Sequence, residues 1–252
     1  MSATPLSGVV TTLNNAATLD ECLASLAFCD EIVVLDSGSS DDTVAIAQRH
    51  GARLHTQAFA GYAAQKQAAI DLASHDWCLL LDADEFLVDP AHAAIQSELS
   101  APRADGYRLP RREWLFWRWV HPGCASNWQL RLFRRSRSRM NQVPVHAEPA
   151  VDGRVLDLRA PLRHRGEADI AARVDKINRY TTGMVDYKRE RGARFVGLRM
   201  LFYPWVAFAR MYFVKRYFLN GWAGFTAARV HAFYAFLKYA KLQEAGRRTP
   251  AD

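Results

Sequence analysis

The stretch WCLLLDADE, residues 77–85, decides the fold of this chain. Its apolar half, Trp77–Leu81, reads as a buried central strand, because a short uninterrupted apolar run is typical of strands in a parallel sheet. The run ends at Asp82, and in such sheets ligands gather beyond the carboxyl ends of the strands. The stretch therefore predicts an α/β domain with an acidic site at the end of this strand.

The rest of the first hundred residues supports this interpretation, because apolar runs alternate with helical patterns as in strand–helix units. We expect strands at 6–13, 31–36 and 53–56, helices at 18–28 and 62–73, and a helix opening at 41–42. Later pieces are β-like at 106–109, 129–134 and 155–158 and helical at 170–190, 195–219 and 222–244. The predicted organisation is one catalytic unit, 1–166, with a donor half 1–100 and an acceptor half 101–166, followed by a helical appendage, 167–252.

Charge is divided unevenly along the chain. Residues 1–100 hold 3 lysines and arginines against 14 acidic residues, whereas the remainder holds 30 against 12 and six of the seven tryptophans. The acidic part can host a cation, and the basic part predicts an anionic, partly apolar partner such as a membrane surface or nucleic acid. The four cysteines have neither zinc-site spacing nor disulfide density, and residues 1–10 lack an export pattern, so we expect reduced thiols in a cytosolic protein.

Two motifs carry the chemistry. Asp82, Asp84 and Glu85 would repel one another unless a cation lay between them, and hard carboxylate oxygens suit Mg²⁺ or Mn²⁺, with a nucleotide diphosphate completing the coordination shell. The alternative is an acidic helix start. In VVLDSGSSDDT, residues 33–43, a carboxylate at a strand end precedes small hydroxylated residues, and this arrangement can bind a base or ribose. The alternative is a strand–turn–helix in which Ser40 or Asp41 only caps the helix.

Together, at this spacing, the two motifs resemble those of the family 2 glycosyltransferases, whose nucleotide-binding fold is called GT-A. The resemblance begins at VVTTLN (9–14). It narrows to a subgroup that adds glucose or a related sugar to the inner core of bacterial lipopolysaccharide, through QLRLFRR (129–135), Val145, His146, His164 and YFLNGWAGF (217–225). No glycine-rich dinucleotide or P-loop motif is present, which argues against hydride transfer and NTP hydrolysis.

The resemblance implies an inverting hexosyltransferase with a UDP-sugar donor and a lipopolysaccharide-core or other lipid-linked glycan acceptor. A protein or another surface polysaccharide as acceptor, or a metal-dependent nucleotidyltransferase, are the alternatives. Carried over by position, Thr11, Asp36 and Ser37 contact the nucleotide, Asp82 approaches the ribose, and Asp84 ligates the metal, for which Asp82 and His164 are further candidates. Ser37 replaces a second Asp, Ala147 separates His146 from Glu148, and Asn220 stands where Asp is common.

The acceptor hydroxyl needs a general base, and the departing diphosphate needs positive charge beside it. Glu148 is the first choice for the base and His146 the second, with Asp105 and Asp152 remaining possible. The cation could come from Lys66, Arg131 or His164. The helical pattern slightly favours a solvent-exposed Lys66, whereas Arg131, between Leu130 and Leu132, is expected to face away from the core and meet phosphate.

Residues 195–242 interleave aromatic side chains with cations. Arg199 and Arg210 interrupt the best candidate for a membrane-spanning helix, and Pro204 disturbs its backbone. We therefore expect attachment to an anionic membrane surface, at the inner face of the bacterial cytoplasmic membrane. The alternative is that these aromatics only pack the appendage onto the catalytic domain. RREWLFWRW, residues 111–119, would permit nucleic-acid binding, but that reading leaves the acidic half unexplained, so we expect no nucleic-acid partner.

Overall fold

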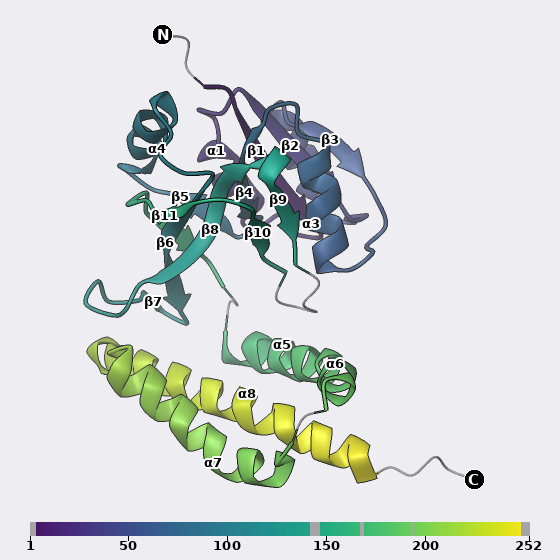
Figure 1. Ribbon diagram of the computed structural model, residues 1–252, viewed down its shortest axis with the longest axis vertical. Coiled ribbons are helices and arrows are strands. Elements are labelled where there is room, and N and C mark those ends of the chain that lie inside the picture. Colours follow the sequence, from purple (N-terminus) through teal and green to yellow (C-terminus); the bar gives the residue numbers. More distant parts are fainter. Residues whose placement is uncertain (1–3, 142–146, 167–168, 193, 248–252) are drawn as a thin grey trace. The chain divides into compact units, whose positions relative to one another are not determined.

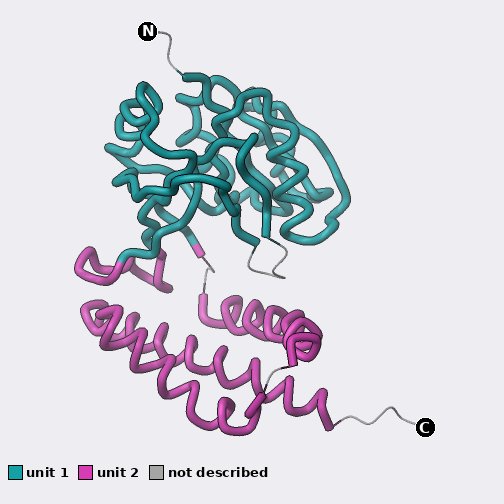
Figure 2. The backbone as a smooth tube through the Cα atoms, viewed as in Figure 1, with its two compact units in different colours: residues 1–112, 126–165 teal, residues 113–125, 166–252 magenta. Residues whose placement is uncertain are grey.

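The computed structural model describes residues 4–141, 147–166, 169–192 and 194–247. The chain forms two compact units, which Figure 2 shows in separate colours. Unit 1 comprises residues 1–112 and 126–165, and unit 2 comprises residues 113–125 and 166–252. Residues 113–125, which belong to the expected acceptor half, therefore group with the C-terminal helices.

Unit 1 is built on a mixed sheet with the strand order β3-β2-β1-β4-β8-β6-β12-β5 (Figure 1). In that order the strands are Arg53–Thr56, Glu31–Asp36, Leu6–Thr12, Trp77–Asp82, Asn127–Arg134, Gly106–Leu115, Leu162–His164 and Glu85–Leu87. The first four are parallel, and β8 is antiparallel to both β4 and β6. Because β2 and β4 flank β1 in parallel, Asp36 and Asp82 lie at the same edge of the sheet, beside Thr12 and Thr11 respectively.

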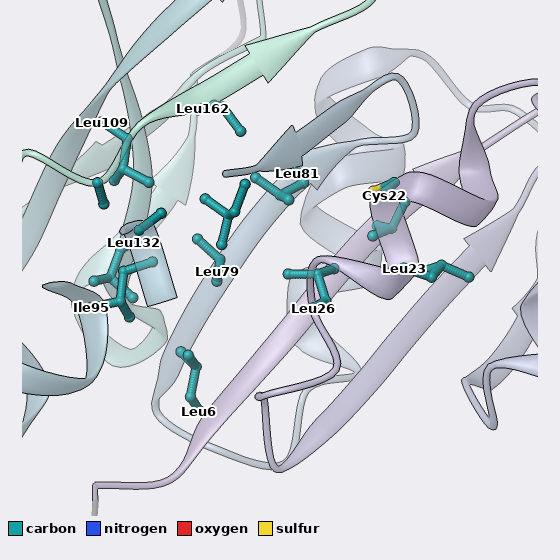
Figure 3. Close-up of a cluster of buried hydrophobic side chains, with 14 of the residues drawn as sticks. Leu6, Cys22, Leu23, Leu26, Leu79, Leu81, Ile95, Leu109, Leu132 and Leu162 are labelled. Carbon is teal, nitrogen blue, oxygen red and sulfur yellow. The ribbon is translucent and has the colours of Figure 1, made fainter. Parts of the chain in front are cut away.

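Apolar side chains alternate between the two faces of this sheet, as the period of a strand requires. Val10 and Val34 contribute to one core, under helices α1 (Leu19–Ala24), α2 (Thr43–Arg49) and α4 (Ala91–Ser100), part of which is drawn in Figure 3. Val9 and Leu35 contribute to the other core, under α3 (Tyr62–Asp71). The strands predicted at 31–36 and 53–56 are confirmed, and β4 includes Asp82 as its last residue.

Several elements of unit 1 depart from the sequence-based prediction. The helix expected at 18–28 ends at Ala24, and the patterns did not indicate β5, α4 or β12. A short hairpin of β9 (Ser138–Met140) and β10 (Pro149–Val151) lies outside the main sheet, while β11 (Val155–Asp157) pairs in parallel with β6. The strands among them have only three residues each, and β5, β11 and β12 pair with strands distant in sequence, so local periodicity could not reveal them.

Unit 2 is helical. It contains α5 (Ile170–Gly183), α6 (Val185–Glu190), α7 (Val196–Ala209), a π-helical turn at Arg210–Val214, a 3-10 turn at Tyr217–Asn220 and α8 (Gly221–Arg247). Helix α8 contacts α5, α6 and α7, and Figure 1 shows α7 and α8 side by side. Within the described ranges, no helix is both long enough and apolar enough to cross a membrane.

The segment 113–125 attaches to these helices through a small core and a buried amide. In its hairpin, Trp114 pairs with Trp119 of β7 (Arg118–Trp119). Its Leu115, Val120 and Cys124 pack with Tyr217, Ala223 and Ala227. The His121 N–H donates to Oδ1 of Asn220 at 2.7 Å, and Nδ2 of Asn220 donates to Sγ of Cys124 at 3.2 Å. The side chain of Asn220 therefore joins the hairpin to the start of α8.

Candidate functional site

The acidic motif lies in a tight connection between two strands. Strand β4 ends at Asp82 and β5 begins at Glu85, so only Ala83 and Asp84 separate them. The next helix, α4, begins at Ala91. The alternative interpretation of an acidic helix start is therefore wrong: the turn directs successive carboxylates to different partners.

Glu85 is fully buried and is held by two arginines. Its carboxylate accepts bonds from Nε and Nη2 of Arg131 at 2.8 and 2.7 Å and from Nη1 of Arg111 at 2.7 Å. It also accepts the backbone N–H of Asp82 at 3.1 Å. A carboxylate removed from water needs such charge-assisted bonds, and the two-point contact with Arg131 fixes the plane of the guanidinium group. Glu85 thereby orients both arginines beneath the site.

Asp82 is the next carboxylate of this network. Its Oδ2 lies 2.9 Å from Nη2 of Arg131, and its Oδ1 pairs with Nζ of Lys66. Burial alone would raise the pKa of the Asp82 carboxyl, but the charges of Lys66 and Arg131 outweigh it and hold this pKa well below its ordinary value. Asp82 is therefore a carboxylate at neutral pH. Together with Glu85 and Arg111, these side chains form a network of three cations and two carboxylates, with one net positive charge.

Two expectations about these cations are corrected. Lys66 is buried on α3 rather than exposed, and Arg131 is 2% exposed rather than free to meet phosphate. Arg131 is covered because β8 is buried on both faces, as the adjacent Leu132 and Phe133 show. The role of Arg111 was not predicted, although a signal exists: in β6 it falls on the same alternation as the buried Tyr107 and Leu109.

Asp84, the remaining carboxylate of the acidic motif, pairs with His164. Nε2 of His164, the last residue of β12, lies 3.1 Å from Oδ2 of Asp84, and both side chains are partly exposed. One carboxylate and one imidazole are compatible with a divalent cation such as Mn²⁺. Within the described ranges, no three His, Cys, Asp or Glu side chains gather to hold a metal by themselves. The pair therefore fits a metal that takes its remaining ligands from a diphosphate and water.

The second motif forms a loop at the end of β2. Asp36 is buried, and its Oδ2 accepts the N–H groups of Gly38 and Ser39, each at 2.8 Å. Gly38 has φ 94°, a conformation that only glycine adopts readily. The side chain of Asn14 accepts the N–H of Ser40 at 2.8 Å, and Oγ of Ser39 accepts the N–H of Asn14 at the same distance. The loop is thus tied to the end of β1.

The other expected nucleotide contacts lie beside this loop. Ser37 donates its N–H to the carbonyl of Thr12 at 2.9 Å, and Thr11 is half-buried and paired in register with Asp82. The ends of β1, β2 and β4 therefore bring Thr11, Asp36, Ser37 and Asp82 to one edge of the sheet. In the capping alternative for the second motif, Asp41 does accept the N–H of Thr43 at the start of α2, but the N-cap residue of this helix is Asp42, whose side chain makes no capping bond.

The expected acceptor-side residues have different environments. Glu148 is exposed. Burial lowers the pKa of Arg131, but the charges of Glu85 and Asp82, with a smaller contribution from Glu148, outweigh burial and raise this pKa. His146 lies outside the described residues. Asp105 is engaged by Arg134 and Arg137, at 3.6 and 3.5 Å. Asp152 is exposed. The charge of Glu148 therefore acts on Arg131, a member of the buried network.

The comparison with protein families identifies the class of this protein. Residues 7–150, which include both motifs, match the model described as "Glycosyl transferase family 2". The chain belongs to this family and is a glycosyltransferase.

One relative is similar over nearly the whole chain. It is the "Lipopolysaccharide core biosynthesis glycosyltransferase LpsC" of Rhizobium meliloti (strain 1021), which is 34% identical over 250 residues that cover 95% of this chain and 92% of that protein. The crystal structure of S. aureus TarS is 16% identical, covers 96% of this chain and 55% of that chain, and has a TM-score of 0.51, so it bears on the fold alone. The expected α/β GT-A fold with C-terminal helices is confirmed.

A further solved structure is similar over a shorter region. Glucosyl-3-phosphoglycerate synthase from Mycobacterium tuberculosis, in complex with Mn²⁺, UDP and glucosyl-3-phosphoglycerate, is 25% identical and covers 43% of this chain and 44% of that chain, with a TM-score of 0.37. Similarity at that TM-score supports no conclusion about this chain.

Proposed function

We propose that this glycosyltransferase moves a hexose from a UDP-sugar to the lipopolysaccharide core or another lipid-linked glycan, with inversion at the anomeric carbon. The similarity to LpsC across almost all of both chains supports the acceptor class. The observation that carries the proposal is the edge of the sheet where the buried network, the Asp84–His164 pair and the Asp36 loop come together.

On the donor side, the loop at Asp36 and the half-buried Thr11 hold the nucleoside, and Asp82 faces its ribose. Asp84 and His164 would hold Mg²⁺ or Mn²⁺, which supplies positive charge to the departing diphosphate. Lys66 and Arg131 stabilise the departing diphosphate while they remain paired with Asp82, because the buried network keeps one net positive charge. A fixed charge in a buried network stabilises a developing anion without having to reorganise.

On the acceptor side, Glu148 accepts the proton of the attacking hydroxyl. Its exposed carboxylate can be reached by a large glycan, and its effect on Arg131 supports a position near the network. Such an acceptor would be met at the inner face of the bacterial cytoplasmic membrane, and unit 2 carries a surface suited to that location.

The test is a donor screen with the purified full-length chain. Release of nucleoside diphosphate from UDP-, GDP- and ADP-sugars is measured with Mg²⁺, with Mn²⁺ and with a chelator, with and without truncated lipopolysaccharide core. We expect metal-dependent release from a UDP-hexose that rises when the core acceptor is added. Release of pyrophosphate, or the absence of nucleoside diphosphate release from every UDP-sugar, would refute the proposal.

A matched pair of variants ties the result to the site. Asp84→Asn keeps the volume of the side chain but removes a negative ligand, so metal-dependent release should be abolished. Asp157→Asn, in an exposed ion pair with Arg108, should behave like the wild type. Full activity of Asp84→Asn at saturating metal would show that Asp84 is not a ligand.

A further inference from the structure

The outer face of α7 is an exposed apolar surface. Leu198, Leu201, Phe202, Trp205 and Val206, here called the α7 surface, are each more than half exposed, with Trp205 at 66%. Their spacing of three and four residues places them on one face of the helix. The opposite face packs on α8, where the rings of Tyr203 and Tyr239 meet edge to face at 5.7 Å. Helix α7 therefore has a packed face and an apolar face that the described residues of unit 2 leave more than half exposed.

Apolar exposure continues where α7 ends. Phe213 and Val214, in the π-helical turn, are 61% and 72% exposed, and Trp222, in the first turn of α8, is 78% exposed. Monomeric soluble proteins rarely leave so many large apolar side chains in water, and such surfaces mark sites of interaction. The expected alternative, that the aromatics of this region only pack the appendage, accounts for Tyr203 but not for these residues.

The charge of the same segment indicates what the surface contacts. Residues 191–243 contain nine lysines and arginines and no aspartate or glutamate. Arg199 and Arg210 are exposed and lie about three helical turns apart, so they line one flank of the α7 surface. Lys215 and Arg216 are exposed in the turn that follows. The partner must therefore be both apolar and anionic.

We propose that the α7 surface lies in the headgroup region of a bilayer that contains anionic lipid. Tryptophan and phenylalanine rings settle at this depth, aliphatic side chains reach the acyl boundary, and flanking cations meet lipid phosphates. A second copy of the chain fits poorly, because two acid-free segments would bring cations against cations. The proposal goes beyond the proposed function and does not depend on which sugar is transferred.

The test is co-sedimentation of the full-length protein with vesicles of equal parts phosphatidylglycerol and phosphatidylcholine, compared with phosphatidylcholine alone. The double variant Arg199→Glu with Arg210→Glu should bind the anionic vesicles at least about 25-fold more weakly, since each cation near such a surface contributes about fivefold. Phe202→Ser with Trp205→Ser should also lose most of its binding. Phe59→Ser and Arg49→Glu make the same changes at exposed positions of unit 1 and should bind like the wild type.

Insertion is measured separately, with lipids brominated on their acyl chains, which quench tryptophans that reach them. Trp205→Phe keeps the apolar face, so it should still bind while part of the quenching is lost. Wild-type protein that fails to bind anionic vesicles at low salt, or α7 variants that bind as well as the wild type, would overturn the proposal. So would sedimentation velocity that shows a dimer abolished by Phe202→Ser with Trp205→Ser.

The donor screen separates this proposal from the proposed function. Loss of vesicle binding in the α7 variants with unchanged metal-dependent UDP release would support membrane attachment and leave the reaction intact. A wild-type protein that releases UDP but binds no vesicles would overturn only the membrane proposal, and one that binds vesicles but releases no nucleotide would count only against the reaction.

Discussion

At the scale of single residues, the site depends on how its buried charges are compensated. Asp82, Asp84 and Asp36 could be located from the sequence, because each ends or follows an apolar strand. The contacts of the network beneath them could not, because Arg131 and Arg111 come from β8 and β6, and the pairing of distant strands is not visible in the local sequence. For Arg111, the alternation in β6 indicated a side chain on the buried face but not its partner. From the sequence, we expected a cation between the carboxylates of Asp82, Asp84 and Glu85. For Asp82 and Glu85, the protein's own side chains supply it.

Glu85→Gln tests the strength of this compensation. The substitution leaves Arg131 and Arg111 buried with less negative charge between them, and breaking a buried ion pair in this way costs about 3–5 kcal/mol. We expect a loss of that size in the free energy of unfolding, measured by urea denaturation. Asp157→Asn, which breaks the exposed pair with Arg108, should cost under about 1 kcal/mol. Equal losses for the two variants would contradict a stabilising role for the network.

The lowered pKa of Asp82 makes a second prediction, about pH. Its folded-state pKa lies below its unfolded value, so the carboxylate contributes stability that is fully present above the unfolded pKa and is lost as the pH falls through the folded one. Asp82→Asn should therefore be less stable than the wild type by a constant amount between about pH 5 and 8, and the difference should shrink below about pH 4. A difference that stays the same down to acid unfolding would contradict the ion pairs with Lys66 and Arg131.

Glu148→Gln tests the assignment of the general base. A base acts on the acceptor proton in the transition state, so kcat should fall by about 100-fold or more while the Kd for the UDP-sugar is unchanged. The measurement is steady-state turnover with calorimetric titration of the donor. Asp157→Asn, which removes an exposed carboxylate paired with Arg108, is the control and should turn over normally. Normal turnover by Glu148→Gln with a dead His146→Ala would transfer the role to His146.

At the scale of elements, the sequence predicted the parallel strands best. Strands β2 and β4 are apolar runs bounded by polar turns, and the ends of β2, β3 and β4 match the prediction within a residue. The helix expected at 195–219 is instead α7 followed by a π-helical turn, and the break comes at Arg216, whose φ is 61°. Nothing in the local sequence requires a left-handed arginine there. It is fixed by contacts with the segment 113–125, where Sγ of Cys124 donates to the Arg216 carbonyl.

Close packing explains the glycine at position 224 in the stretch YFLNGWAGF (217–225), and it makes a prediction about helix α8. A methyl group at this position in α8 would overlap the carbonyl oxygen of Tyr217, a backbone atom that cannot move aside easily. Gly224→Ala should lower the free energy of unfolding by about 1–3 kcal/mol or more, as overpacking does. Gly197→Ala, in α7, meets nothing within 4 Å and should be neutral or gain up to about 1 kcal/mol. Thermal unfolding of both variants decides the matter, and a harmless Gly224→Ala would contradict the close packing of the 3-10 turn on α8.

At the scale of the whole molecule, charge follows the folded units more closely than it follows the sequence. Unit 1 contains 16 lysines and arginines against 18 acidic residues, because residues 126–165 return basic strands to the acidic first hundred. Unit 2 contains 17 against 8. The sequence indicated one acidic and one basic half, but the pairing of β8 with β4 places basic strands in unit 1, so that unit is nearly balanced and the positive excess belongs to unit 2.

The two units also have separate apolar cores, and this division makes the last prediction. Two sets of buried residues cover the two faces of the sheet in unit 1, and a smaller set around Tyr217 and Ala223 lies in unit 2. A ligand stabilises the part of the protein that binds it, by about 2.7 kcal/mol at a hundredfold excess over its Kd. Calorimetry with UDP and Mn²⁺ should therefore raise one unfolding transition and leave the other in place. Glu85→Gln should lower the transition that UDP raises, whereas Gly224→Ala should lower the one that UDP does not affect. A single transition that moves with the ligand and with both variants would mean that the units unfold together.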